Sequence, residues 1–219
     1  MNAESALRVA VLISGRGSNL QALIDAIAEG RLDAEIAVVI CNHKHAPGIQ
    51  RARAAGIATY VFVRRDYESR ETQHEAMLAC AQEHDAELIV LGGFDRILSP
   101  AWVETYPNRI INIHPSLLPA FAGGMNPKPQ QDALEAGVKI AGCTVHIATA
   151  DVDAGPIVAQ AAVPVLADDT VDTLANRILA QEHRLLPQVV QWFAEGRVHI
   201  EGDRVRIAGV IPCLWWSDG

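Results

Sequence analysis

Strand-like and helix-like apolar patterns alternate along the first half of the chain. Short β-branched runs predict strands at residues 7–14, 35–41, 59–63, 88–91 and 110–113. Segments with helical periodicity lie between them and predict helices at residues 19–29, 47–55 and 69–84. Strands that alternate with helices in this way form parallel sheets with helices packed on both faces. We therefore predict an α/β fold with a doubly wound, mostly parallel sheet.

The order of the elements changes in the second half of the chain. Two strand-like runs, at residues 142–148 and 157–165, flank a polar turn and predict a hairpin with a wide loop. The composition shows no break and the sequence contains no internal repeat. We therefore interpret the 219 residues as a single domain, 1–219, with a short tail from residue 201.

A long helix is predicted to follow the hairpin. Asp169 and Thr170 offer an N-cap, and the helix is expected to run to about Glu195, where Gly196 is well placed to end it. Beyond it, short apolar runs on either side of Gly202 predict a small terminal hairpin.

Composition and charge exclude several classes of partner. No apolar run approaches the ~20 residues that a membrane-spanning helix needs, and the first residues lack a secretion signal, so we expect a cytoplasmic protein. The net charge of −8 argues against binding to nucleic acid and is compatible with a local basic pocket for an anionic small molecule. We expect a monomer or homodimer. We expect no metal, because His43-Lys44-His45 beside Cys41 is better explained as a solvated turn. Reduced thiols are predicted for Cys41, Cys80, Cys143 and Cys213, which lack CxxC spacing.

Polar side chains end the predicted strand at residues 110–113. Asn112 and His114 are two residues apart and therefore face the same side of the strand. In open α/β sheets ligands gather at the carboxyl ends of the strands, so both side chains can point at one ligand oxygen. An isolated histidine at this place would more commonly be a loop cap. The pairing with Asn112 is what favours a functional site.

A glycine-containing turn joins the first predicted strand to the first helix. Its sequence, Ser14-Gly15-Arg16-Gly17-Ser18-Asn19-Leu20, offers backbone amides, a helix N-terminus and one positive charge, which suit a phosphate group. It is not a dinucleotide-binding fingerprint, because Leu20 stands where the third glycine would be, and it is not a Walker sequence. Taken alone, the motif is explained slightly better as a tight turn with an N-cap.

Two further turns carry polar residues. The segment Gly92-Gly93-Phe94-Asp95-Arg96-Ile97-Leu98 follows a buried strand, and its glycines allow a flat ligand to approach the backbone. A simple strand-to-helix turn explains this segment about as well. Asp153 begins the turn Asp153-Ala154-Gly155-Pro156, where an aspartate is usually structural.

In combination, these motifs resemble those of the phosphoribosylglycinamide formyltransferases. The most specific parts are the turn at residues 14–20, the Asn-Ile-His-Pro-Ser-Leu-Leu-Pro block at residues 112–119, and Gly142-Cys143-Thr144-Val145-His146 with Asp153-Ala154-Gly155-Pro156 downstream. The resemblance covers nearly the whole chain. It implies a formyltransferase fold with a phosphate-binding half at about 1–100, a catalytic and folate-binding half at about 101–200, and a tail at 201–219.

The resemblance also implies an activity and the residues that perform it. The formyl group of 10-formyltetrahydrofolate would pass to the glycyl amine of glycinamide ribonucleotide, in de novo purine biosynthesis. The catalytic residues would be Asn112, protonated His114 and Asp153, which keeps the imidazole charged. The acceptor would be bound by Gly17, Ser18, Asn19, Leu20, Gln21 and Glu182. The folate would be bound by Arg70, Asp95, Arg96, Ile97, Leu98, Asn112 and the loop at residues 148–153, and the Leu118-Pro119 peptide bond is expected to be cis.

The chain departs from the family pattern in three places. Asp95 stands where methionine is common, which brings a carboxylate to the border of the expected pterin pocket. Arg16 stands where asparagine is frequent, a change that strengthens the attraction for an anion. The loop at residues 120–129 appears longer than usual and lacks a histidine.

Three alternative functions share parts of the pattern. The runner-up is a formyltetrahydrofolate deformylase, in which water replaces the amine; residues 124–127 favour it slightly, whereas the phosphate-binding turn, Pro115 and the lack of an N-terminal regulatory domain do not. A methionyl-tRNA formyltransferase would need a basic C-terminal RNA-binding domain. A catalytically silent nucleotide- or folate-binding protein would have no need of Asn112, His114 and Asp153 together.

Overall fold

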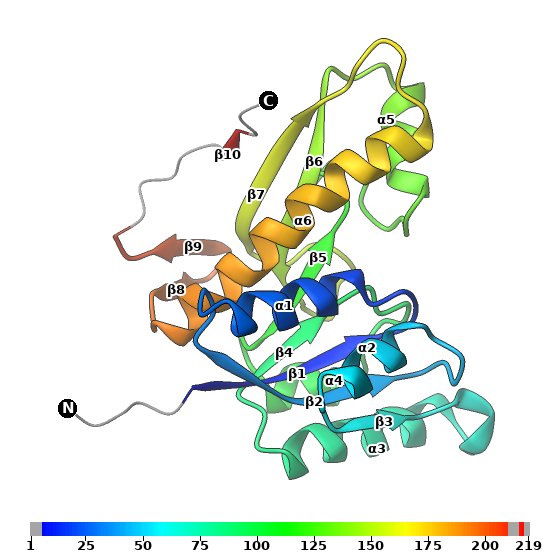
Figure 1. The fold of residues 1–219 in the computed structure, drawn as a ribbon, viewed down its shortest axis with the longest axis vertical. Coiled ribbons are helices and arrows are strands. Elements are labelled where there is room, and N and C mark those ends of the chain that lie inside the picture. Colours follow the sequence, from blue (N-terminus) through cyan, green and yellow to red (C-terminus); the bar gives the residue numbers. More distant parts are fainter. Residues whose placement is uncertain (1–5, 210–214, 217–219) are drawn as a thin grey trace.

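The computed structural model describes residues 6–209 and 215–216, and in them one large sheet forms the centre (Figure 1). This sheet has eight strands in the order β10-β7-β6-β5-β4-β1-β2-β3. Their bounds are β1 Leu7–Ile13, β2 Ala34–Cys41, β3 Thr59–Val61, β4 Leu88–Leu91, β5 Ile110–His114, β6 Ile140–Ile147, β7 Ile157–Pro164 and β10 Trp215–Trp216. A separate antiparallel hairpin consists of β8 Val198–Glu201 and β9 Arg204–Ile207. Apart from β10, these strands occupy the stretches in which the sequence predicts them.

The sheet is mostly parallel, as predicted. Strands β3, β2, β1, β4 and β5 run parallel to one another. The pairs β5–β6 and β6–β7 are antiparallel, and a wide loop joins β6 to β7. The predicted α/β fold and hairpin are therefore confirmed.

Helices cover both faces of the sheet. They are α1 Ser18–Ala28, α2 Gly48–Ala54, α3 Arg70–Glu83, α4 Pro100–Thr105, α5 Lys128–Glu135 and α6 Val171–Ala194, with a short 3-10 helix at Arg64–Asp66. Side chains of α1, α2, α5 and α6 belong to one hydrophobic cluster, and those of α3 and α4 belong to another. No helix of the described residues is long and apolar enough to cross a membrane.

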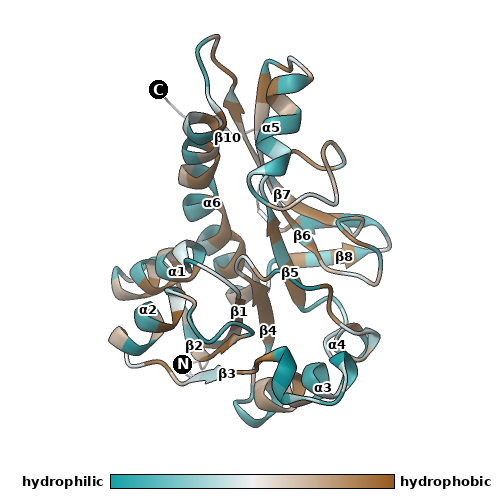
Figure 2. Ribbon diagram, turned by 90° about the vertical axis from the view of Figure 1, so that its right-hand side faces the viewer, coloured by the Kyte–Doolittle hydropathy of each residue, from teal (hydrophilic) through white to brown (hydrophobic). Residues whose placement is uncertain are grey.

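The two clusters explain why the central strands read as continuous apolar runs. In β1, Val9, Val11 and Ile13 pack under α1 and α6, while Ala10 and Leu12 pack against the α3 face. A strand buried on both faces needs apolar residues at every position. Figure 2 accordingly shows the middle of the sheet as hydrophobic.

Capping residues set the ends of the long helix α6 where the sequence predicts them. Thr170 is the N-cap, and its hydroxyl accepts a hydrogen bond from the Thr173 amide while the Thr173 hydroxyl accepts one from the Thr170 amide. Gly196 follows the last turn with a φ of 65°, a left-handed conformation that suits glycine. The Leu118-Pro119 peptide bond is cis, as expected.

Four elements were not predicted, and one of them is the 3-10 helix at Arg64–Asp66. Helix α4 has six residues, too few to show a helical period. Helix α5 has the polar sequence KPQQDALE and begins inside the segment interpreted as a loop at residues 120–129. Strand β10 is two residues long, and its backbone pairs with Ala161 and Ala162 of β7. Among the predicted thiols, Cys41, Cys80 and Cys143 are free and buried, and Cys213 lies outside the described residues.

Candidate functional site

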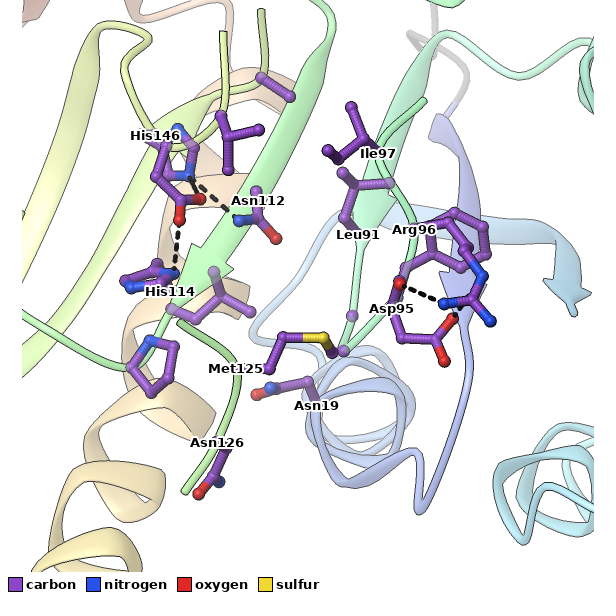
Figure 3. A pocket seen from close by; sticks show the side chains of 18 of the residues that line it. Asn19, Leu91, Asp95, Arg96, Ile97, Asn112, His114, Met125, Asn126 and His146 are labelled. Atoms are coloured by element: carbon purple, nitrogen blue, oxygen red, sulfur yellow. Dashed lines mark hydrogen bonds and ion pairs between the residues drawn. The ribbon is translucent and has the colours of Figure 1, made fainter. Parts of the chain in front are cut away.

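A cavity of about 500 Å³ opens at the carboxyl ends of β1, β4 and β5, bordered by the β6–β7 loop and by the loop that precedes α5. Its size is in the range of small-molecule sites, and its place is the one where ligands bind in open α/β sheets. Figure 3 shows Asn112, His114 and His146 on one side of the cavity. Arg96 and Ile97 lie on the other side. The cavity therefore separates two of the predicted groups of site residues and has room for a ligand between them.

Asn112, His114 and Asp153 meet on one wall of this cavity. Asn112 and His114 come from the same face of β5, and Asp153 comes from the β6–β7 loop. The His114 Nδ1 lies 3.3 Å from an Asp153 carboxylate oxygen. Both side chains are almost fully buried, with 5% and 10% of their surface exposed. Residues 39 apart in the sequence are thus brought into contact by the fold.

His146 completes this wall, although the sequence predicted no role for it. It lies directly opposite Asn112 in the β5–β6 register. Its Nε2 is 3.1 Å from the Asn112 Nδ2 and 3.6 Å from the second Asp153 oxygen. The side chain is 2% exposed, so it bridges Asn112 and Asp153 in a buried position. Its place in the 142–146 motif, at an inward-facing strand position, was the signal that could have indicated it.

The loop before α5 also reaches these residues through its backbone. The Phe121 carbonyl oxygen lies 3.2 Å from the His114 Nε2, and the Gly123 amide donates a 2.9 Å hydrogen bond to Asp153. Both ring nitrogens of His114 therefore face acceptors, Asp153 on one side and Phe121 on the other. A ligand oxygen can accept a hydrogen bond from His114 only when it shares or replaces one of these contacts. The loop at residues 120–129, which departs from the family pattern, is thus part of the site.

Burial and the neighbouring acceptors act in opposite directions on the pKa of His114. Removal from water lowers the pKa of the imidazole, and this effect outweighs the Asp153 carboxylate and the Phe121 carbonyl, which act to raise it. The pKa of Asp153 is lowered, since hydrogen bonds from His146 and Gly123 and the nearby imidazoles outweigh its own burial. Asp153 therefore acts on the His114 pKa in the expected direction, and burial acts against it.

The N-terminus of α1 forms a second part of the cavity. Gly17 precedes the helix with a φ of 68°, and no side chain caps the helix. The first helical hydrogen bond runs from the Gln21 amide to Gly17, so the amides of residues 18–20 have no partner inside the helix. A Cβ on Gly17 would lie 2.7 Å from the Gly48 Cα, so only glycine fits. Free amides at a positive helix end form a ready anion site.

The predicted acceptor-binding residues divide into two groups. Gly17, Ser18 and Asn19 line the cavity. Leu20 is fully buried in the core, and only its backbone is available to a ligand. The side chain of Gln21 lies in a neighbouring groove, where it accepts a 3.2 Å hydrogen bond from Arg51. The structure therefore does not bring the Leu20 and Gln21 side chains to the cavity.

Arg16 and Arg51 frame the same turn. Arg16 lines the cavity with an exposed side chain, and its carbonyl accepts a 3.0 Å hydrogen bond from the Arg51 Nε. The sequence did not indicate Arg51, which lies on α2 and is distant in sequence from the turn. Two guanidinium groups near free amides add to the attraction for an anion.

Glu182 of α6 lines the cavity next to the N-terminus of α1. The Asn19 Nδ2 donates a 2.8 Å hydrogen bond to its carboxylate, and both residues are buried. Burial raises the pKa of Glu182, with the Asn19 bond acting against it. The Asn19 Oδ1 is buried without a partner among the described residues. A polar pair with an unused acceptor suits a ligand that carries hydroxyl or amine donors.

The opposite wall contains the predicted folate-binding segment. Arg96, Ile97 and Leu98 line the cavity, and Ile97 is 52% exposed. Arg70, at the first turn of α3, donates a hydrogen bond to the Ile97 carbonyl, although it does not line the cavity itself. Asp95 lines the cavity, but its carboxylate is bound to side chains at the ends of β1 and β2.

Two exposed apolar side chains extend this wall. Met125, from the loop before α5, is 55% exposed, and Val152, from the β6–β7 loop, is 49% exposed. Both line the cavity. Exposed apolar groups around polar backbone suit a flat heterocycle with a polar edge. Among the residues that the structure describes, no group of His, Cys, Asp or Glu is arranged to hold a metal ion.

Comparison with known proteins identifies the family. The chain is 40% identical over 203 residues to the phosphoribosylglycinamide formyltransferase of Escherichia coli, covering 93% of this chain and 94% of that one. Its structure matches the glycinamide ribonucleotide transformylase 1 of Symbiobacterium toebii with a TM-score of 0.89 at 50% identity, covering 93% and 94% of the two chains. A formyltetrahydrofolate deformylase from Pseudomonas syringae matches with a TM-score of 0.86 at 28% identity, covering 94% of this chain and 66% of that one. The sequence model of the formyl transferases matches residues 7–190, and the chain therefore belongs to the formyl transferase family.

Proposed function

We propose that this protein transfers the formyl group of 10-formyltetrahydrofolate to the glycyl amine of N1-(5-phospho-D-ribosyl)glycinamide, a step of de novo purine biosynthesis. The observation that carries the proposal is the arrangement of Asn112, His114 and Asp153 on one wall of the cavity, where His114 contacts Asp153 and His146 links Asn112 to Asp153. This wall lies between an uncapped helix N-terminus, which suits a phosphate, and the wall at residues 93–98, whose exposed Ile97 suits a flat ring.

The acceptor is proposed to bind on the α1 side. Its phosphate would accept hydrogen bonds from the free amides of residues 18–20, with Arg16 adding positive charge. The Asn19–Glu182 pair would receive the donors of the sugar or of the glycinamide group. These contacts would direct the glycyl amine toward Asn112.

The folate donor is proposed to bind against residues 93–98. Backbone groups of this segment would read the polar edge of the pterin, while Ile97 and Val152 would cover its faces. The formyl carbon would then lie between the acceptor amine and His114. Bound substrates held in this way react as if at very high local concentration.

The residues of the catalytic wall supply two functions. Attack by the amine converts the formyl oxygen into an oxyanion, and the Asn112 amide would donate a hydrogen bond to it, a contribution of ~3 to 4 kcal/mol for one such donor. His114 in its unprotonated form would take the proton from the attacking nitrogen and become an imidazolium beside Asp153. The imidazolium would then support the oxyanion and return its proton to the folate N10 leaving group. The lowered pKa of His114 suits this role, because a base must be unprotonated before the reaction.

The proposed location is the cytoplasm. The free thiols of Cys41, Cys80 and Cys143 support a reducing compartment. The proposed partners are the two small-molecule substrates, and the state of the protein stays a prediction of monomer or homodimer.

An absorbance assay of the folate, with and without glycinamide ribonucleotide, tests the proposal. Loss of the formyl group that depends on the acceptor supports transfer. Loss without the acceptor supports hydrolysis, the activity of the deformylase relative, and no loss under either condition supports a protein that only binds.

A further inference from the structure

The carboxylate of Asp95 collects hydrogen bonds from the ends of two neighbouring strands. The Ser14 hydroxyl, after β1, lies 2.9 Å from one oxygen, and the Asn42 Nδ2, after β2, lies 2.6 Å from the same oxygen. The His43 Nε2 lies 2.8 Å from the other oxygen. Asp95 itself follows β4, which is adjacent to β1 in the sheet. One side chain therefore ties together the carboxyl ends of three consecutive parallel strands.

This arrangement answers what the carboxylate does at the border of the cavity. Both of its oxygens are bonded to protein donors, and those bonds lower the pKa of Asp95 despite partial burial. Because both of its oxygens already accept hydrogen bonds from the protein, this carboxylate is not available to bind the folate directly. Its effect on the cavity must then come through the backbone that it holds.

The segment at residues 93–98 is itself neither helix nor strand. The Phe94 side chain packs in the hydrophobic cluster with α3 and α4. Three hydrogen bonds hold the backbone: the Ser14 amide bonds to the Gly93 carbonyl at 3.1 Å, the Asp95 amide donates to the Ser14 hydroxyl at 2.8 Å, and Arg70 donates to the Ile97 carbonyl. Asp95 adds the contacts with Asn42 and with His43. Without these two contacts, the hydrogen bonds of Asp95 would connect the segment to the end of β1 and not to the end of β2.

We propose that His43 and Asp95 form a positioning pair that fixes the wall at residues 93–98 and thereby sets the affinity of this protein for tetrahydrofolate compounds. This inference rests on the proposed function only in that the wall binds folate. The pair acts by keeping the wall in its binding conformation. Folate binding then loses less free energy to the conformational entropy of ordering the wall. It takes no part in the chemical step.

His43 offers the cleaner test of the pair. Its side chain is 47% exposed, so truncation leaves no buried cavity. Removal of the Asp95 carboxylate would instead leave the Ser14 hydroxyl and the buried Asn42 amide without their acceptor, which can destabilise the fold. A hydrogen bond between an exposed imidazole and a carboxylate predicts a rise of about threefold to tenfold in the dissociation constant when His43 is truncated.

The experiment is calorimetric titration of tetrahydrofolate into the wild type, His43→Ala, His43→Gln and His45→Ala. Tetrahydrofolate should bind more weakly to His43→Ala, and His43→Gln, which keeps a donor, should recover most of the affinity. His45 is an exposed histidine of the same loop, and its truncation should leave binding unchanged. In steady-state assays, His43→Ala should raise the KM for the donor and leave kcat and the acceptor KM unchanged.

Equal affinity of the wild type and His43→Ala would overturn the inference, as would equal weakening in His45→Ala or no recovery in His43→Gln. The binding measurements need no acceptor and no turnover. A wild type that binds tetrahydrofolate but formylates no acceptor would therefore contradict the proposed function, while the comparison of variants would still decide the role of His43. A wild type that does not bind tetrahydrofolate would overturn both.

Discussion

Replacing Asp153 with asparagine removes one negative charge from beside His114 and keeps the size and shape of the side chain. In the proposed reaction the charge acts only after His114 has taken a proton, because an imidazolium is attracted to the carboxylate and a neutral imidazole is not. The substitution is therefore expected to lower kcat much more than it weakens the binding of either substrate.

The magnitude follows from the distance. At an effective dielectric constant of about 20, unit charges 3.3 Å apart attract each other by about 5 kcal/mol. Relaxation and the 10% exposure of Asp153 reduce this figure. Since 1.36 kcal/mol corresponds to a tenfold change in rate, we expect kcat to fall by roughly 10² to 10⁴.

The assay is initial-rate measurement of formyl transfer at saturating concentrations of both substrates, together with thermal unfolding. A matched control is Asp168→Asn, because Asp168 is an exposed carboxylate that does not line the cavity. The control should keep the wild-type rate, and Asp153→Asn should stay folded despite a weaker bond from Gly123. A folded Asp153→Asn protein with nearly wild-type kcat would refute the electrostatic argument.

Three further predictions test other parts of the site. Asn112→Ala should lower kcat by about 10² to 10³ in the same assay, because one oxyanion donor is lost; an effect on KM alone would contradict this role. Gly17→Ala should lower the melting temperature and raise the KM for the acceptor, because the new Cβ would lie 2.7 Å from the Gly48 Cα at a φ of 68°; an unchanged acceptor KM would argue against a phosphate at this turn. In a pH–rate profile, kcat/KM should fall as the pH drops through the lowered pKa of His114, because protonation removes the base, and this acidic limb should move to lower pH in Asp153→Asn; an acidic limb that does not move would refute the coupling of the two side chains.

The sequence predicted the elements whose physical cause is local. The β1 run shows its burial on both faces through five consecutive apolar residues, Val9 to Ile13, and Thr170 and Gly196 mark the ends of α6 through cap preferences that act within one turn. Helix α5 was not predicted, because its residues are mostly polar and its position depends on packing against α6. No local sequence pattern indicates such packing.

The sequence indicated which residues belong to the candidate site better than it indicated their pKa shifts and hydrogen bonds. The spacing of Asn112 and His114 on one strand places them on one face, and the family resemblance adds Asp153 from a loop. The lowering of the His114 pKa could not be read from the sequence, because it results from burial, which is a property of the assembled fold. The contacts of Phe121 and Gly123 are made by backbone atoms, which carry no sequence signal. The direction of the Asp95 carboxylate depends on Ser14 and Asn42, which are far from it in the chain.

This protein is proposed to pass a formyl group from a folate to a glycyl amine. Mass spectrometry of glycinamide ribonucleotide, after incubation with the protein and 10-formyltetrahydrofolate, tests this claim directly. We expect the acceptor to gain one formyl group in the presence of the wild type and far more slowly with His114→Ala. An unmodified acceptor, with formate released in its place, would contradict the account.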